Sequence, residues 1–303
     1  MGTSPDAYES AAHLLRSIDL AHASDLQMCV TFYSDVLDVH AAQDFVDCTR
    51  PSLAHLTLNL RTFDASAFVP ALIATGKQLR KELLSPYNWF RFYLKPDAFP
   101  SANGIRHPIL YLDTDTVVIS DLTGLFTSLS STDVFGAVPE RKRLGEDLCA
   151  NSTRTGIPPS LTEKEAINAG VLLMDLEAWW KRGVLSRWRE LMLRHSDLRY
   201  NRFCGIYKLP GQTELQLIGV PYALLPRVYN VLNLGGRGSH KDWQQRFEGI
   251  RGGGKILHWN GPHKPWKRKN LINKTRWEQA VQRAWKDTEP PVQCHSPSIT
   301  RRA

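Results

Sequence analysis

The chain has 303 residues, a formal net charge of +8, and 42% hydrophobic and 10% aromatic residues. This length and composition exclude a disordered chain and allow one large α/β domain or two small ones. The longest apolar runs have the length of a strand, so we expect no transmembrane helix. The N-terminus lacks the pattern of a signal peptide.

Apolar spacing and turn residues predict the secondary structure in chain order. The predicted elements are a helix over 7–23, strands over 27–33 and 54–60, helices over 66–84 and 87–99, strands over 108–112 and 134–138, a loop over 141–165, a strand over 169–174, a helix from Asp175 to about His195, a strand over 255–259 and a helix over 277–285. In the first half, strands alternate with helices, which indicates a mostly parallel sheet covered by helices on both faces.

Cysteines and tryptophans carry no cofactor motif. The five cysteines include no C-x-x-C pair, so they indicate no zinc site, and their odd number predicts no disulfide framework. Trp179, Trp180 and Trp188 lie on one predicted helix, where an aromatic stripe is more typical of core packing than of a sugar platform.

Two aspartates, Asp113 and Asp115, follow the apolar run 108–112. Side chains two residues apart point the same way on an extended chain, so both carboxylates can converge on one point. Ligands bind at the carboxyl ends of strands in open α/β sheets, and paired carboxylates suit Mg²⁺ or Mn²⁺. The alternative is that either aspartate forms a turn or caps a helix.

A second motif, KILHWNGPHKPW, spans residues 255–266. It places His258 at the end of a short strand, followed by a turn with Gly261 and by Lys264. A neutral imidazole can complete a manganese site, glycine lets backbone amides approach a phosphate, and lysine adds a charge. Taken alone, His258 is more typical of a buried core histidine.

Together, these motifs resemble glycosyltransferase family 8. The resemblance is carried by LYLDTDTVV (110–118), INAGVLLMDLEAW (167–179) and LHWNGPHKPW (257–266), with NWFRFYL (88–94) similar to the arginine helix of the family. It implies an α/β protein of the GT-A class, with a Rossmann-like, mostly parallel sheet and flanking helices. One catalytic domain is expected over 1–287, followed by a disordered tail over 288–303.

The resemblance also implies a retaining transfer of a hexosyl or uronosyl group from a UDP-sugar to an acceptor hydroxyl, dependent on Mn²⁺ or Mg²⁺. Asp113, Asp115 and His258 are then the expected metal ligands, and Gly261 and Lys264 are the expected diphosphate contacts. The other implied site residues are Arg91 at the donor sugar or phosphate, Asn168 and Gln212 near the reacting sugar, and Tyr8, Thr3 and Asp6 at the uridine. Without the family, Asn168 would be interpreted as a turn residue before a strand.

The chain departs from the family pattern in two places. The apolar strand that usually precedes the uridine loop is absent, because Met1-Gly2-Thr3 leads directly to Asp6. We therefore expect the first strand to be missing, as in a truncated sequence that has also lost a membrane anchor. Gly211 stands where many members carry an aspartate before the glutamine, here Gln212.

The expected partners are a nucleotide-sugar donor and a glycan, glycoprotein or other hydroxyl-bearing acceptor. The net charge could also indicate nucleic-acid binding, but basic and aromatic residues do not interleave on a recognisable strand, so we expect no nucleic acid. A membrane partner and a Golgi or secretory location are expected if an anchor precedes the chain, and a cytoplasmic location otherwise. Two alternatives remain: an inactive relative that acts as a binding module, and a metal-dependent nucleotide-sugar hydrolase.

Overall fold

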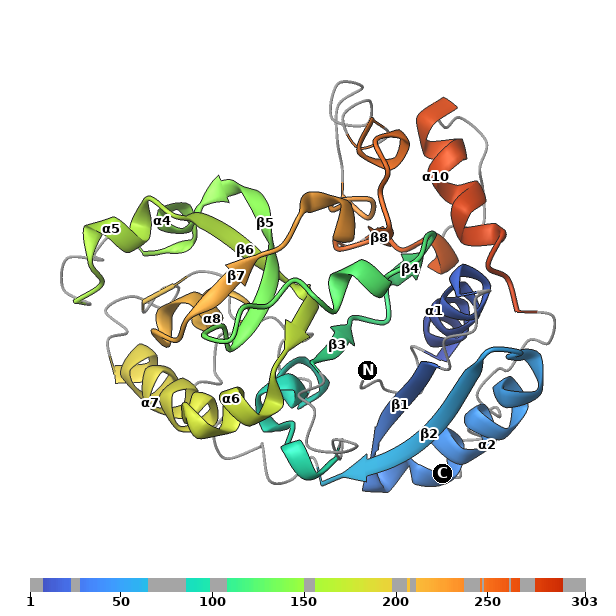
Figure 1. Cartoon of the computed structure of the whole chain (residues 1–303), viewed down its shortest axis with the longest axis horizontal. Coiled ribbons are helices and arrows are strands. Elements are labelled where there is room, and N and C mark those ends of the chain that lie inside the picture. Colours follow the sequence, from blue (N-terminus) through green and yellow to red (C-terminus); the bar gives the residue numbers. More distant parts are fainter. Residues whose placement is uncertain are drawn as a thin grey trace, which may run out of the picture. The chain divides into compact units, whose positions relative to one another are not determined.

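The computed structural model of the chain forms two compact units. Unit 1 comprises residues 1–64, 112–124 and 227–303, and unit 2 comprises residues 65–111 and 125–226. The structure describes residues 8–22, 28–64, 86–98, 108–149, 156–197, 206–207, 211–236, 246, 248–261, 263–267 and 276–290. Both units combine strands with helices (Figure 1).

Unit 1 begins with helix α1 (Tyr8–Ala21), strand β1 (Met28–Asp35), helix α2 (Val39–Thr49) and strand β2 (Leu56–Phe63), with the 3₁₀ turns η2 (Val36–Asp38) and η3 (Arg50–Ser52) beside α2. β1 and β2 pair in parallel, with Met28 opposite Leu56. Parallel neighbours need a crossover connection, which α2 supplies. Buried apolar side chains, among them Leu15, Phe32 and Phe45, join α1 and α2 to the strands.

The rest of unit 1 contains strands β4 (Thr116–Val118) and β8 (Ile256–His258), the turns η10 (Thr123–Leu125), η12 (Arg227–Tyr229) and η13 (Pro265–Lys267), and helix α10 (Arg276–Lys286). β4 and β8 form an antiparallel pair. α1 is tied to β4 because the Val118 backbone N–H donates to Ser17 Oγ at 2.9 Å. A second apolar cluster around Leu257, Trp259 and Trp285 covers the β4–β8 pair.

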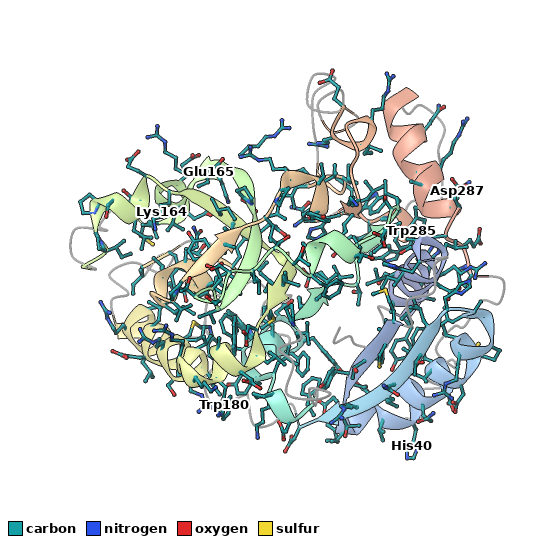
Figure 2. The ribbon with its side chains drawn as sticks, viewed as in Figure 1. His40, Lys164, Glu165, Trp180, Trp285 and Asp287 are labelled. Carbon is teal, nitrogen blue, oxygen red and sulfur yellow. The ribbon has the colours of Figure 1, made fainter. Side chains whose placement is uncertain are left out.

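Helix α10 is held to α1 through His13, whose ring stacks on Trp285 with the centroids 4.0 Å apart. Figure 2 labels Trp285 on α10. His13 Nδ1 lies 3.2 Å from the Trp285 carbonyl oxygen and 3.1 Å from Thr288 Oγ1. Thr288, the first residue of the predicted tail, is therefore buried in unit 1.

We expect His13 to make the protein sensitive to acid. Burial, only partly opposed by the Trp285 hydrogen bond, lowers the pKa of His13 from 6.5 to about 4. Between these values the unfolded chain binds more protons than the folded chain, so stability falls as the pH decreases from 6.5 to about 4. The loss should be about 2–3 kcal/mol.

The measurement is the free energy of unfolding as a function of pH for the parent protein and for His13→Gln. The variant should show a shallower decline below pH 6.5. His40→Gln is the matched control, because His40 is exposed on α2 (Figure 2). Equal acid dependence in the parent and His13→Gln would contradict the prediction.

Unit 2 is built on a four-stranded sheet in the order β3-β6-β5-β7, formed by β3 (Ile109–Leu112), β5 (Phe135–Arg143), β6 (Glu165–Met174) and β7 (Tyr222–Leu224). β5 runs antiparallel to β6 and parallel to β7. β6 lies in the interior of the sheet, and its run Val171, Leu172, Leu173 and Met174 is fully buried. This continuous apolar run is typical of a strand that is covered on both faces.

The helices of unit 2 are α4 (Leu144–Asp147), α5 (Pro159–Thr162), α6 (Leu176–Lys181), α7 (Val184–Asp197) and α8 (Thr213–Leu217). The expected aromatic core is present: Trp188 stacks on Phe92 with the centroids 4.8 Å apart, and Trp179 meets Phe135 edge-on. Trp180 differs from the other two tryptophans, because it is 48% exposed on α6 (Figure 2).

Two predicted helices differ from the observed structure. The helix expected over 87–99 is instead three 3₁₀ turns, η6 (Pro86–Asn88), η7 (Phe90–Tyr93) and η8 (Pro96–Ala98). Trp89, Phe90 and Phe92 are all buried there, so aromatic packing overrides the helical spacing. The helix predicted from Asp175 does begin with Asp175 as its cap, but it breaks at Gly183, where φ is +63°. The helix predicted over 66–84 lies outside the described residues.

The predicted loop over 141–165 is partly structured. β5 continues through it to Arg143, which pairs with Glu165 of β6. The Arg143 backbone N–H then donates to Glu146 Oε1 at 2.8 Å at the start of α4. The pairing of β5 with β6 is irregular between Pro139 and Arg143, and the side chains there are exposed or only partly buried, so the strand extension has no apolar pattern in the sequence.

The prediction of no disulfide framework is wrong. Cys48 and Cys149 each take part in a disulfide bond, whereas Cys29 is free and exposed. An odd number of cysteines requires only one unpaired thiol. Among the described residues, no helix has the length and apolar content needed to cross a membrane.

Candidate metal and donor site

Asp113 and Asp115 lie in a tight turn between β3 and β4. β3 ends at Leu112, and the turn is closed by Thr116 Oγ1, which donates to the Asp113 carbonyl oxygen at 2.8 Å. The two carboxylates converge as predicted, but the reason differs. A turn brings them together, whereas the sequence pattern suggested alternation along an extended strand.

His258 reaches these carboxylates because β4 and β8 are paired. Thr116 lies opposite His258 in the register, and the Trp259 backbone N–H donates to the Asp115 carbonyl oxygen at 2.9 Å. His258 Nε2 consequently lies 3.1 Å from Asp115 Oδ1. Two segments separated by more than one hundred residues are therefore brought together by a three-residue ladder.

The imidazole of His258 is oriented from behind by Asn230. His258 Nδ1 lies 3.1 Å from Asn230 Oδ1, and both side chains are buried. An amide oxygen can only accept, so His258 Nδ1 donates to Asn230, and this hydrogen bond holds the ring with Nε2 directed at Asp115. A hydrogen bond of this kind on the far side of the ring is usual for a histidine that binds a metal.

The three side chains fit a divalent cation. Asp113, Asp115 and His258 each offer one ligand atom, and these atoms lie within 4.8 Å of one another. Burial opposes ionisation of Asp115, but His258 and Lys264 outweigh this effect and hold the pKa of its carboxyl below the usual range. The carboxylate is therefore charged at neutral pH. Two oxygens and one imidazole nitrogen form a donor set that Mn²⁺ accepts.

The loop after β8 places Lys264 beside this group. The Lys264 ammonium pairs with Asp115 and donates to the Trp259 carbonyl oxygen at 2.7 Å. Gly261 has a φ of +114°, and a Cβ there would lie 2.8 Å from the Gly235 carbonyl oxygen. Glycine is required because the backbone is left-handed and closely packed at this position.

Three other predicted residues lie in unit 2. Arg91 comes from η7, is buried, donates to the Ala169 carbonyl oxygen and lies 4.6 Å above the Tyr111 ring. Asn168 Nδ2 lies 3.3 Å from Gln212 Oε1, so the structure brings these two side chains together. Gly211 has a φ of +106°, and its backbone N–H donates to Glu214.

Tyr8, one of the three predicted uridine contacts, is buried in the core of unit 1. Tyr8 is 1% exposed and stacks on Phe45 with the ring centroids 4.7 Å apart. It would have to leave this stack to contact a uracil base. Thr3 and Asp6 lie outside the described residues.

Sequence reasoning missed two polar residues at these sites. Asn230 orients His258, and Glu140 accepts hydrogen bonds from both Asn168 and Gln212. Neither residue belongs to a motif with recognisable spacing. Their roles depend on contacts between distant segments, and only the folded chain reveals such contacts.

Comparisons with known proteins show the family to which the chain belongs. The model of glycosyl transferase family 8 matches residues 9–270, and the chain therefore belongs to this family. It is 28% identical over 271 residues to the probable galacturonosyltransferase-like 2 of Arabidopsis thaliana, a match that covers 82% of this chain and 70% of that protein. It is also 28% identical to the probable galacturonosyltransferase-like 7 of the same plant, with 74% of this chain and 59% of that protein covered. The chain thus spans well under the full length of these relatives.

A solved structure confirms the expected architecture. The galactosyltransferase LgtC, in complex with donor and acceptor sugar analogues, matches with a TM-score of 0.64 at 16% identity, and the match covers 94% of each chain. At this identity the likeness shows the fold alone. The fold is the α/β GT-A fold of glycosyltransferases.

Proposed function

We propose that the protein is a retaining glycosyltransferase that uses a divalent cation and moves a hexosyl or uronosyl group from a UDP-sugar to an acceptor hydroxyl. Membership of the family supports glycosyl transfer in general. The observation that carries the finer proposal is the group of Asp113, Asp115 and His258, whose ligand atoms lie within 4.8 Å of one another.

The residues of unit 1 would act on the donor diphosphate. A cation bound by Asp113, Asp115 and His258 would supply positive charge where negative charge grows as UDP leaves. Lys264 lies beside this group and would add its own charge to the same phosphates. The loop at Gly261, where glycine permits the left-handed backbone and its close packing on Gly235, would bring backbone N–H groups to the same phosphates.

Asn168 and Gln212 would act on the sugar, which is the role that the family resemblance implies for them. The paired amides of Asn168 and Gln212 offer oxygen atoms that can stabilise positive charge on the reacting carbon. In front-face attack, the acceptor hydroxyl would approach on the side that UDP leaves, with a UDP oxygen helping to take its proton. This route preserves the configuration without requiring a carboxylate nucleophile.

We further propose that the protein works in an oxidising compartment such as the secretory lumen. The disulfide bonds of Cys48 and Cys149 support this location, because structural disulfides persist in oxidising environments and are rare in the cytosol. The expected acceptor is a glycan, a glycoprotein or another hydroxyl-bearing molecule. The donor sugar and the acceptor are best identified by assay.

The test is release of UDP from a panel of UDP-sugars, with Mn²⁺ and with a chelator, together with thermal unfolding in the same mixtures. A donor at one hundred times its Kd should stabilise the fold by about 2.7 kcal/mol. Release of UDP should require the metal. Asp113→Asn should lose both the metal-dependent turnover and the metal-dependent stabilisation by the donor. Metal-dependent stabilisation without turnover would favour an inactive binding module. Release of free sugar even when acceptors are present would favour a hydrolase.

A further inference from the structure

Three polar side chains from separate elements of unit 2 form one hydrogen-bonded group. Glu140 comes from β5, Asn168 from β6 and Gln212 from the residue before α8. Glu140 Oε1 accepts from Asn168 Nδ2 at 3.2 Å and from Gln212 Nε2 at 3.1 Å. One carboxylate oxygen therefore joins the two amides that the proposed function assigns to the sugar.

Glu140 is itself fixed on its other side by Lys142. The Lys142 ammonium lies 2.9 Å from Glu140 Oε2 and 2.7 Å from Asp147 Oδ1. The Glu140 and Asp147 side chains are only 15% and 6% exposed. Burial opposes the charge of Lys142, but the two carboxylates outweigh it and raise the pKa of Lys142, so its ammonium persists at neutral pH. This mostly buried cation fixes the position of the Glu140 side chain.

The hydrogen bonds define the orientation of each amide. Asn168 Oδ1 accepts from the Gly170 backbone N–H at 2.9 Å, so Asn168 must turn its Nδ2 toward its other partners. Because a carboxylate only accepts, Gln212 must turn Nε2 toward Glu140. Gln212 Oε1 then accepts from Asn168 Nδ2 at 3.3 Å and keeps one lone pair for a ligand.

We propose that Glu140, held by Lys142, is a positioning residue that orients the Gln212 amide so that its oxygen, and not its nitrogen, is offered to the reacting sugar carbon. This inference rests on the proposed function. A reversed amide would present N–H groups to a carbon that becomes positive, and this contact would be repulsive. The carboxylate therefore acts through Gln212 and need not touch the substrate.

The test is a double-mutant cycle between Glu140→Gln and Gln212→Ala, with kcat and donor KM measured separately. Glutamine at position 140 can donate to Gln212 and so permits the reversed amide. We expect kcat to fall about 10- to 100-fold with donor KM little changed. In the Gln212→Ala background the same change should have almost no further effect, because the residue through which Glu140 acts is gone. Independent, additive effects would overturn the proposal.

A matched control and a second variant distinguish the positioning role of Glu140 from a general loss of folding. Glu163→Gln makes the same chemical change in an exposed ion pair of unit 2 and should leave kcat unchanged. Lys142→Met removes the cation that fixes Glu140 without touching either amide, and it should lower kcat in the same direction. Full activity of both Glu140→Gln and Lys142→Met would also overturn the proposal.

A spectroscopic readout separates this inference from the proposed function. The side-chain NH₂ resonances of Gln212, identified by their loss in Gln212→Ala, report the hydrogen bond to Glu140 without any turnover. They should shift in Glu140→Gln and stay in place in Glu163→Gln. If the protein transfers no sugar, the proposed function fails while the shift still tests the orientation. If the protein is active but the resonances do not move, the positioning role fails alone.

Discussion

Replacing Asp115 with asparagine is expected to abolish binding of Mn²⁺ at micromolar concentrations and to reduce metal-dependent turnover at least about 1,000-fold. The neutral amide removes one of two carboxylate charges from a group that also contains His258. Asp115 is the residue that connects this group to Lys264 as well, through separate oxygen atoms. Its loss therefore weakens both the metal ligand set and the placement of the lysine.

Two measurements decide this prediction. Calorimetric titration with Mn²⁺ gives the affinity directly, and UDP release gives the turnover. Asp47→Asn is the matched control, because Asp47 is 55% exposed in an ion pair elsewhere in unit 1. If Asp115→Asn keeps parental Mn²⁺ affinity and turnover, the ligand assignment is wrong.

Replacing Gly261 with alanine should disrupt the loop that carries Lys264. Alanine is disfavoured at a φ of +114°, and its Cβ would lie 2.8 Å from the Gly235 carbonyl oxygen and 3.2 Å from the Gly236 nitrogen. Both neighbours are backbone atoms and cannot rotate away as a side chain can. Strain and overlap together should cost about 2–4 kcal/mol locally, which moves the loop or destabilises unit 1.

The matched control for Gly261→Ala is Gly253→Ala. Gly253 also has a positive φ, +91°, but a Cβ there would meet nothing within 4 Å. This second change should lower the stability by only about 1 kcal/mol, because alanine at Gly253 has an unfavourable φ but no steric overlap. Thermal unfolding measures the stability of each variant. The affinity for UDP in the presence of Mn²⁺ reports whether the loop still places Lys264 for binding. Indistinguishable behaviour of the two variants would show that the close approach to Gly235 has no energetic importance.

The sequence was sufficient to predict that Asp113, Asp115 and His258 lie together, because they belong to short, strongly patterned segments. Asp113 and Asp115 follow a buried strand, and His258 ends another, so local chemistry pointed to a shared site. The pairing that joins them depends on the register of β4 and β8, which three residues per strand define only within the folded chain. Asn230 and Glu140 were missed for the same reason, since each acts through a partner far away in sequence.

Other expectations failed where tertiary packing competes with local preference. The spacing of residues 87–99 favours a helix, yet the buried rings of Trp89 and Phe92 are accommodated in 3₁₀ turns. The break at Gly183 divides a helix that the apolar pattern alone would continue. The expectations of one domain over 1–287 and of the uridine contacts remain predictions.

The ion pair of Lys264 with Asp115 has a thermodynamic consequence for ligand binding. The Lys264 ammonium is an internal counterion for the Asp115 carboxylate. An incoming cation must compete with it, and the displaced ammonium then needs another anion. A diphosphate supplies one, so cation and nucleotide should each increase the affinity for the other, and by linkage the increase is the same in both directions.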